Sequence, residues 1–361
     1  MVVPDRETVP AADEADPGTA TFEPAEDPAA KLLEALASDD HAARLAAADK
    51  LAATGEKRAI EPMLQAFKGC DEACRHHLAR LLAGMGRIAR IVLVQALEDP
   101  DPGIRAGAAE ALGVAKFFAA AAAKKLSGSL YDPDPTARRS AAEALDRFGW
   151  RPHGEAAEAA RLVALNRWDD AIAIGPGAAR AFVTNLHNDE DYYRRRAANA
   201  LVKLGPAATG PLLHTLAGPD ERARALAVWV LGEMHAADAT DTLLAALADE
   251  NPGVREAALV ALDKLGAAKH FDNILTRLTD ESDFVRVAAV EVVGHLGNGR
   301  AAASITGRLD DPSPDVRRVA AETLGRLRDA GSARALLRTL TDEDHGVRYA
   351  AEQALAEIEK V

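Results

Sequence analysis

The chain has 361 residues, with 43 basic and 56 acidic side chains and a formal net charge of −13. This acidic balance argues against general nucleic-acid binding, which requires a positive surface along the phosphates. Aromatic residues make up only 4% of the chain, which favours closely packed helices over sheets, and no apolar run approaches membrane-spanning length, so no membrane segment is expected.

Residues 1–28 form an acidic segment rich in proline. They contain eight acidic residues, one basic residue and five prolines, so they carry −7 of the total charge. Such a segment cannot bury an apolar core, and we expect it to be disordered. It also lacks the apolar stretch of a signal peptide, and two cysteines, Cys70 and Cys74, make no disulfide framework. These features predict a reducing, cytoplasmic compartment.

From residue 29 to residue 361 the chain repeats with a period close to 31 residues. An arginine marks each unit, followed seven residues later by an apolar residue and preceded eight residues earlier by another. The ten arginines are Arg44, Arg75, Arg105, Arg138, Arg194, Arg224, Arg255, Arg286, Arg317 and Arg348. A period of this length, held over ten units, predicts supersecondary units stacked into a solenoid.

Each unit is expected to form two helices. In the first, apolar residues stand twelve and eight positions before the arginine, and this step of four places both on one helical face. A loop such as 311–314, where an acid or Ser precedes Pro, then marks the start of the second helix. At about 100° per residue, positions −1, 0, +3, +4 and +7 share one side of that helix. The periodic arginine therefore lies on the packed side, and positions −2, +1, +2, +5 and +9 lie on the open side.

An aspartate precedes six of the ten arginines by six residues. These are Asp99, Asp132, Asp249, Asp280, Asp311 and Asp342. Because the arginines lie on the packed side, we interpret the pairs as a charge-assisted ladder that ties loops and neighbouring repeats together. The ten arginines are therefore not predicted to form a ligand site.

The Asp-x5-Arg spacing and the ending Ala-Ala-Glu-Thr-Leu-Gly at 320–325 resemble the short HEAT-like repeats first associated with phycobilin lyases. The resemblance covers residues 29–361 and implies an all-α fold, an α-solenoid or HEAT-like superhelix of ten two-helix repeats. It also implies one alternative function, that of a bilin-lyase-type enzyme or enzyme subunit, although a shared fold is a weak argument for a shared activity.

One irregularity interrupts the array. The step from Arg138 to Arg194 is 56 residues, which places an extra helical insertion at 149–175, between the fourth and fifth units. It contains Trp150, a helical stretch at 155–165 and Trp168, and a similar pattern occurs in other members of this repeat class. We interpret the two tryptophans as packing plugs. The alternative is that the insertion bends the array or forms a binding ledge.

No catalytic residue, metal or cofactor is predicted. Deoxyhypusine hydroxylases, which are helical-repeat proteins, bind two irons through His-Glu dyads, and this chain has no such dyad. Cys70 and Cys74, followed by His76 and His77, could hold zinc. However, Cys74 stands where other units place valine, so a small buried thiol is the favoured interpretation. Neither a glycine-rich phosphate loop nor a GxSxG motif points to an enzyme.

The functional prediction comes from the outward positions of the second helices, which line the concave side in HEAT-like solenoids. Exposed arginines and aromatics of the kind enriched at binding hot spots gather there. The candidate partner-binding residues are Arg139, Arg147, Tyr192, Arg195, Arg196, Asn199, Lys203, Trp229, Phe284, His295, Arg326 and Tyr349. We predict a non-catalytic adaptor or scaffold that binds a protein with an acidic, partly apolar segment. The alternatives are a solvated helix surface with incidental aromatics and a nucleic-acid binder that uses the central basic patch.

Overall fold

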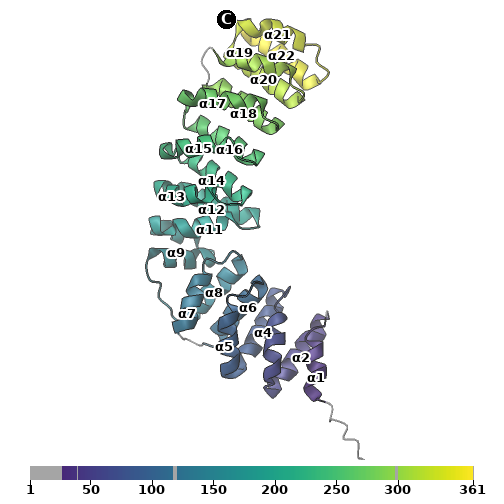
Figure 1. The fold of residues 1–361 in the computed structure, drawn as a ribbon, viewed down its shortest axis with the longest axis vertical. Helices are drawn as coiled ribbons and strands as arrows, with labels where there is room; N and C mark the ends of the chain where they lie inside the picture. Colours follow the sequence, from purple (N-terminus) through teal and green to yellow (C-terminus); the bar gives the residue numbers. More distant parts are fainter. Residues whose placement is uncertain (1–26, 39, 117–119, 297–299, 361) are drawn as a thin grey trace, which may run out of the picture.

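The computed structural model describes residues 27–38, 40–116, 120–296 and 300–360. Within these residues it contains twenty-two α-helices and eight short 3-10 helices and no strand. Figure 1 shows the helices stacked in pairs along a curved array, with α1 and α2 at one end and α21 and α22 at the other. The all-α solenoid expected from the sequence is therefore confirmed.

Ten repeats each contribute a first and a second helix. The first helices are α1 (Pro28–Ala35), α3 (Ile60–Gln65), α5 (Gly86–Ala96), α7 (Ala120–Ser129), α11 (Ala179–Leu186), α13 (Thr209–Leu216), α15 (Thr240–Ala246), α17 (Phe271–Leu275), α19 (Ala301–Thr306) and α21 (Ala333–Thr339). The second helices are α2 (His41–Thr54), α4 (Glu72–Gly84), α6 (Pro102–Val114), α8 (Pro135–Arg147), α12 (Asp191–Leu204), α14 (Glu221–Glu233), α16 (Pro252–Lys264), α18 (Asp283–Leu296), α20 (Pro314–Leu327) and α22 (His345–Ile358).

Short 3-10 turns extend or lead into several first helices. They are η1 (Lys57–Ala59), η2 (Pro176–Ala178), η3 (Gly205–Ala208), η4 (Ala237–Ala239), η5 (Ala268–His270), η6 (Thr276–Thr279), η7 (Gly307–Asp310) and η8 (Ala330–Ser332). Such turns are common at helix ends because they satisfy part of the free backbone groups there.

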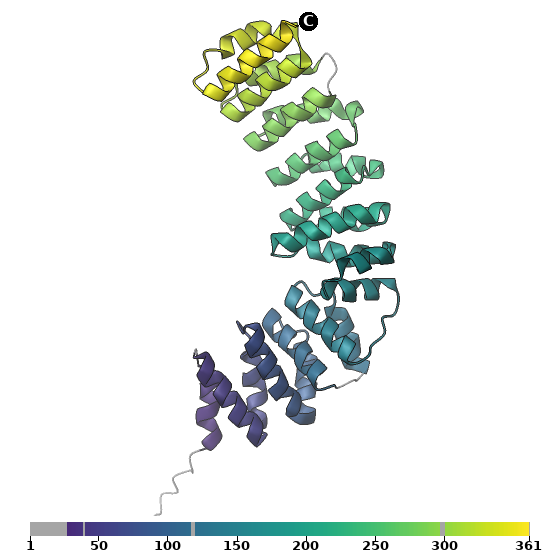
Figure 2. The ribbon, with the colours of Figure 1, turned by 180° about the vertical axis from the view of Figure 1, so that it is seen from behind.

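The insertion forms a further, shorter pair of helices. These are α9 (Glu155–Ala164) and α10 (Trp168–Ile174), which lie between α8 and α11 in the stack. The stack changes direction at this level, as Figure 1 and the view from behind in Figure 2 both show. The insertion is thus an additional layer of the solenoid at its bend.

The second helices begin at the predicted capping residues. The Asp101 side chain accepts a hydrogen bond from the backbone N–H of Ile104, and Pro102 is the first residue of α6. Asp134 and Pro135 start α8 in the same way. An acidic N-cap satisfies one free N–H, and a proline at the first position sacrifices no helical hydrogen bond.

The same signal corrects the predicted start of the solenoid. Asp27 caps α1, and Pro28 is the first residue of that helix. Asp27 also forms an ion pair with Arg58. The last two residues of the proposed tail therefore belong to the first repeat, because an Asp-Pro pair is itself a helix start. Residues 1–26 of that tail lie outside the described residues.

A continuous apolar core runs between the first and second helices. In nine of the ten units the apolar residue seven places after the arginine is buried, as at Leu231 and Leu324, each of which is followed by glycine. The glycine after it permits close packing, because a Cβ atom on Gly232 would lie 2.8 Å from the Cα atom of Ala261, and one on Gly325 would lie 2.7 Å from that of Ala354. The Leu-Gly ending therefore fills the core and lets the next second helix approach.

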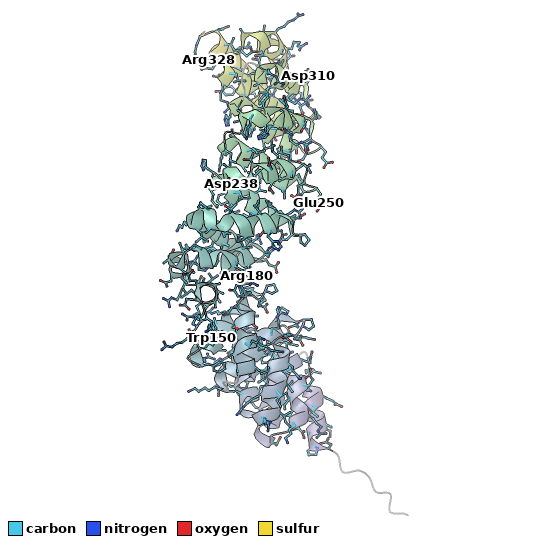
Figure 3. All side chains as sticks on the ribbon, turned by 60° about the vertical axis from the view of Figure 1, so that its left-hand side comes forward. Trp150, Arg180, Asp238, Glu250, Asp310 and Arg328 are labelled. Atoms are coloured by element: carbon cyan, nitrogen blue, oxygen red, sulfur yellow. A yellow bond between two sulfur atoms is a disulfide. The ribbon has the colours of Figure 1, made fainter. Side chains whose placement is uncertain are left out.

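The second helices line the concave side of the array (Figures 1 and 2). Loops within a repeat lie along one edge, where Figure 3 labels Glu250 and Asp310, and loops between repeats lie along the other, where it labels Asp238 and Arg328. The functional prediction assumed that the second helices line the concave side, and the structure places them there.

Candidate functional site

The periodic arginines form the predicted ladder. The Nη1 atom of Arg255 donates to the carbonyl oxygens of Asp249 (2.9 Å) and Glu250 (3.1 Å) in its own loop. Its Nε and Nη2 atoms donate to the two carboxylate oxygens of Asp280 in the next repeat, at 3.0 and 2.7 Å. Four further pairs repeat this cross-repeat contact: Arg105 with Asp132, Arg224 with Asp249, Arg286 with Asp311, and Arg317 with Asp342.

The ladder stabilises the charged form of both partners. Burial opposes ionisation of Asp280, but hydrogen bonds from Arg255 and from the backbone N–H of Ser282 outweigh it, so the pKa of this carboxyl is lowered. The hydrogen bond to Asp280 in turn raises the pKa of Arg255. The interpretation of these arginines as structural is therefore confirmed for the five pairs, since each is committed to a buried or half-buried carboxylate.

The ladder is broken on both sides of the fifth repeat. Asn188 stands where six of the loops carry aspartate, and Arg138 donates instead to the Oδ1 atom of Asn185 at 2.7 Å. Burial without a carboxylate partner lowers the pKa of Arg138. At the next step Gly218 stands at the aspartate position, so Arg194 also lacks a cross-repeat carboxylate. The predicted basic patch thus lies where the ladder is interrupted, as it also is at Arg44 and Arg75, which bond to His41 and Glu110 instead.

The two tryptophans of the insertion are packed to different extents. Trp168 is 3% exposed and stacks on Phe182 with ring centroids 5.7 Å apart. Trp150 is half-buried and meets the ring of His153 edge to face. Figure 3 labels Trp150 and Arg180 near the bend of the stack. The packing role expected for Trp168 is confirmed, whereas the side chain of Trp150 is only half-buried.

A groove lies between α12 and α14 on the concave side and unites three of the predicted site residues. It has a volume of about 570 Å³ and is lined by Asp191, Arg194, Arg195, Ala198, Asn199, Arg222, Leu226 and Trp229. The residues from α14 are spaced four and three apart, so one face of that helix forms one wall. Three guanidinium groups and one carboxylate surround an apolar patch made of Leu226 and Trp229.

Arg196 does not line this groove, although the sequence places it on the same open side. Its Nη1 atom donates to the Oδ1 atom of Asn166 at 2.7 Å and to the hydroxyl of Tyr192 at 3.2 Å. Its guanidinium also lies 5.0 Å from the ring centroid of Trp168. The insertion therefore holds Arg196 outside the groove that Trp229 lines, although both residues are among the candidates on the open side.

A second groove follows α4 and α8 toward the start of α12. It has a volume of about 1000 Å³, and its lining includes the predicted residues Arg139 and Arg147 as well as His76 and His77. Four arginines and four glutamates line it, and many of these charges are paired internally. Glu110, for example, accepts from the Nε atom of Arg75 at 3.2 Å and lies 2.7 Å from the Nδ1 atom of His76. This balance offers a charged ligand little net attraction.

The other predicted residues are spread along the concave side. Lys203 is exposed near the end of α12. Phe284 on α18 is 71% exposed and Tyr349 on α22 is 58% exposed, with α20 between these two helices. His295 lies between Asp263 (Nδ1 to Oδ2, 3.0 Å) and Arg326 (Nε2 to Nη1, 3.3 Å). These residues form a separate surface from the groove between α12 and α14.

The structure corrects the expectation for the two cysteines. Cys70 and Cys74 form a disulfide, with Cα atoms 5.6 Å apart. Cys74 is buried as expected, but it is not a free thiol, because the four-residue spacing across the start of α4 brings Cys70 within bonding distance. Among the described residues no group of three or more His, Cys, Asp or Glu side chains is arranged to hold a metal ion.

Sequence reasoning missed five residues of the groove, one of which, Ala198, stands at position +4 on the packed side. Arg222 and Leu226 stand at positions −2 and +2 of their unit, so the open-side rule itself could have found them. Asp191 starts α12 and stands at position −3, outside that rule. Arg194 is a periodic arginine, and all ten of these were set aside as structural. The signal for Arg194 was the glycine at the next aspartate position.

A curved solenoid of helical pairs with a concave groove defines the class of protein. The family model described as HEAT repeats matches residues 60–146, 209–292 and 271–356, which together exceed half of the chain. The chain therefore belongs to the HEAT-repeat family. This match does not distinguish the phycobilin-lyase class of these repeats. A comparison with curated proteins finds no match.

Several solved structures are similar to this chain, with low TM-scores and low sequence identity. An engineered protein superposes with a TM-score of 0.44 at 20% identity, over 91% of this chain and 98% of its own. The karyopherin Kap121p bound to the SUMO protease Ulp1p gives 0.42 at 14% identity, over 91% of this chain and 45% of its own. A designed armadillo repeat protein in complex with the peptide (KR)4 gives 0.38 at 20% identity, over 49% and 98%.

In the described ranges, each helix is too short or too polar to cross a lipid bilayer.

Proposed function

We propose that this chain is a non-catalytic scaffold or adaptor whose groove between α12 and α14 binds an acidic, partly apolar segment of a partner protein. The observation that carries the proposal is the lining of that groove, in which Arg194, Arg195 and Arg222 surround Leu226 and Trp229. A positive groove in a chain of net charge −13 is a local feature that selects acidic ligands by charge complementarity.

The side chains of the groove differ in what they offer a ligand. Arg195 is 75% exposed and pairs with Asp191 of its own helix, a contact that contributes little to stability. Trp229 is half-buried against the core, so its ring is a fixed apolar surface. Asn199 is exposed, and its amide has both a donor and an acceptor for a peptide backbone. An extended segment can use all three.

Narrower statements also belong to the proposal. The Ala-Ala-x-x-Leu-Gly ending at 320–325 supports placing these repeats in the phycobilin-lyase class of HEAT repeats. The acidic character of the partner is supported by the charge of the groove.

The experiment is a selection of peptides from a random display library on the full chain. We expect the selected peptides to combine Asp or Glu with apolar residues and to lose binding to the double variant Arg195→Glu, Arg222→Glu, because charge reversal slows association and adds repulsion. Trp229→Ala should weaken binding by about 2 kcal/mol or more if the indole is a central anchor. Circular dichroism should remain that of the wild type.

Arg326→Glu is the matched control, since Arg326 is exposed on the concave side of α20, away from the groove. It should bind the selected peptides as the wild type does. Selected peptides without acidic residues, or peptides that bind the charge-reversed variant equally well, would show that this groove is not the binding site. The surface around Phe284 and Tyr349 would then be the next candidate.

A further inference from the structure

Arg194 holds the same position as the ladder arginines. Its Nη1 atom donates to the carbonyl oxygens of Asn188 (2.7 Å) and Asp189 (2.6 Å), as the Nη1 atom of Arg255 does in its own loop. The guanidinium is therefore anchored through the same nitrogen. In Arg255, the remaining edge, formed by Nε and Nη2, faces the next repeat and holds an aspartate.

The loop position that corresponds to the ladder aspartate of Arg194 holds a glycine, which has no carboxylate. Gly218 stands six residues before Arg224, where later loops carry Asp249, Asp280 and Asp311. The nearby Asp220 caps α14 and lies 2.8 Å from the Nδ1 atom of His187. Within the described residues, Arg194 pairs with the carboxylate of Asp191 on the same helix, whose Oδ1 atom lies 3.2 Å from Nη2 of Arg194.

Arg194, which meets no aspartate at position 218, lies in the wall of the groove between α12 and α14. Arg194 lines that groove together with Arg195 and Arg222, and its side chain is only 12% exposed. A guanidinium held on one side and sheltered from solvent binds a carboxylate more strongly than an exposed one does, because its geometry is already fixed and competing water is limited.

We propose that Arg194 is a carboxylate subsite, in which an Asp or Glu side chain of the bound segment takes the place that the aspartate of the next repeat takes elsewhere in the ladder. This inference depends on the proposed function and names the recognition element within it. The bound carboxylate accepts two parallel hydrogen bonds from Nε and Nη2, and Asp191, which also pairs with Arg195 (2.6 Å), is the internal competitor that it displaces.

The experiment observes the side-chain Nε–H resonance of Arg194 by NMR on the full chain while acetate is added at constant ionic strength. Acetate is the probe because it is the carboxylate of Asp and Glu without the rest of the residue. The resonance is identified by its loss in Arg194→Lys. We expect the signal of Arg194 to shift and saturate. The signal of Arg255, whose edge is filled by Asp280, should stay unchanged.

Two variants act in opposite directions. Gly218→Asp restores the ladder carboxylate, so it should abolish the acetate response of Arg194 while raising the urea midpoint of unfolding. A Cβ atom at this position would lie 3.1 Å from the carbonyl oxygen of Thr215, but aspartate occupies the matching loop position in later repeats. Asp191→Asn removes the competitor, so saturation should occur at an acetate concentration several-fold lower than in the wild type.

Each outcome decides the matter. A resonance of Arg194 that does not respond to acetate in the wild type or in Asp191→Asn overturns the subsite, and so does a response that survives in Gly218→Asp. If peptides selected on the groove depend on Arg195 and Arg222 but bind Gly218→Asp normally, the proposed function stands and the subsite is wrong. If Arg194 responds to acetate but no peptide is selected, the subsite stands and the proposed function is wrong.

Discussion

At the scale of single residues, position within a second helix decides what an arginine does. Arg286 lies on the packed side, is 9% exposed, and holds both carboxylate oxygens of Asp311 at 3.0 and 2.8 Å. Arg195 is displaced by one position from the same register and is 75% exposed. A buried bidentate pair is a strong contact, whereas an exposed pair contributes little. The first arginine therefore supports the fold and the second is available for binding.

This difference predicts the effect of two alanine substitutions. Arg286→Ala should lower the free energy of unfolding by about 3 kcal/mol, because it leaves the carboxylate of Asp311, with a side chain 1% exposed, without its main partner. Arg326→Ala should change it by no more than about 0.5 kcal/mol, since that side chain is exposed. Urea denaturation followed by circular dichroism measures both. Equal midpoints for the two variants would mean that the ladder does not stabilise the array.

At the scale of helices and loops, the fifth repeat lacks the ladder aspartate on both of its sides. The loop before α12 carries Asn188, which is 3% exposed and whose Nδ2 atom has no hydrogen-bond partner among the described atoms. A buried donor without a partner costs free energy. The repeat that forms one wall of the groove thus lies at a weak step of the ladder.

Replacing this asparagine should repair the step. We expect Asn188→Asp to raise the free energy of unfolding by about 1 kcal/mol, because a carboxylate there would remove the unpaired N–H and give the buried Arg138 an ionic partner. The backbone N–H of Glu190, which donates to Asn188 Oδ1, would keep its acceptor. The matched control is Asn199→Asp, an exposed position on α12. A lower urea midpoint for Asn188→Asp than for the wild type would contradict the explanation.

At the scale of the whole molecule, the curvature and the insertion determine where a partner can bind. The second helices form the concave side, and the stack changes direction at α9 (Figures 1 and 2). The groove lies between the first two second helices beyond that bend, α12 and α14. A partner segment that runs along the concave side would meet the positive groove just after the bend.

The acidic segment before the first repeat gives a prediction at this scale. Deletion of residues 1–26 should leave the helical circular dichroism signal and the melting temperature unchanged, because a segment of this composition contributes no apolar core. The deletion must spare Asp27, which caps α1 and pairs with Arg58. A longer deletion that also removes α1 should lower the melting temperature, since α1 covers α2. A loss of helical signal in the shorter deletion would show that residues 1–26 are structural.

The sequence by itself determined the repeat, its register and the ladder. A 31-residue period and the 3.6-residue turn of the helix place Leu231 in the core and Arg255 on the packed side. This placement does not require knowledge of the neighbouring repeat. Each repeat contacts mainly its neighbours, so local spacing is enough to place the arginines and aspartates beside the loops. That is why Asp280 could be named as part of the ladder, although its donor in the preceding repeat emerged only from the coordinates.

Only the tertiary structure decided which outward side chains share a groove. Arg195 and Arg196 are neighbours on the open side, but contacts with Asn166 and Trp168 of the insertion hold Arg196 away from the groove that Arg195 lines. Those contacts span about 30 residues and depend on the bend and on side-chain rotamers, neither of which a repeat period encodes. The same reason explains why the open edge of Arg194 became visible only once the neighbouring loop was in place.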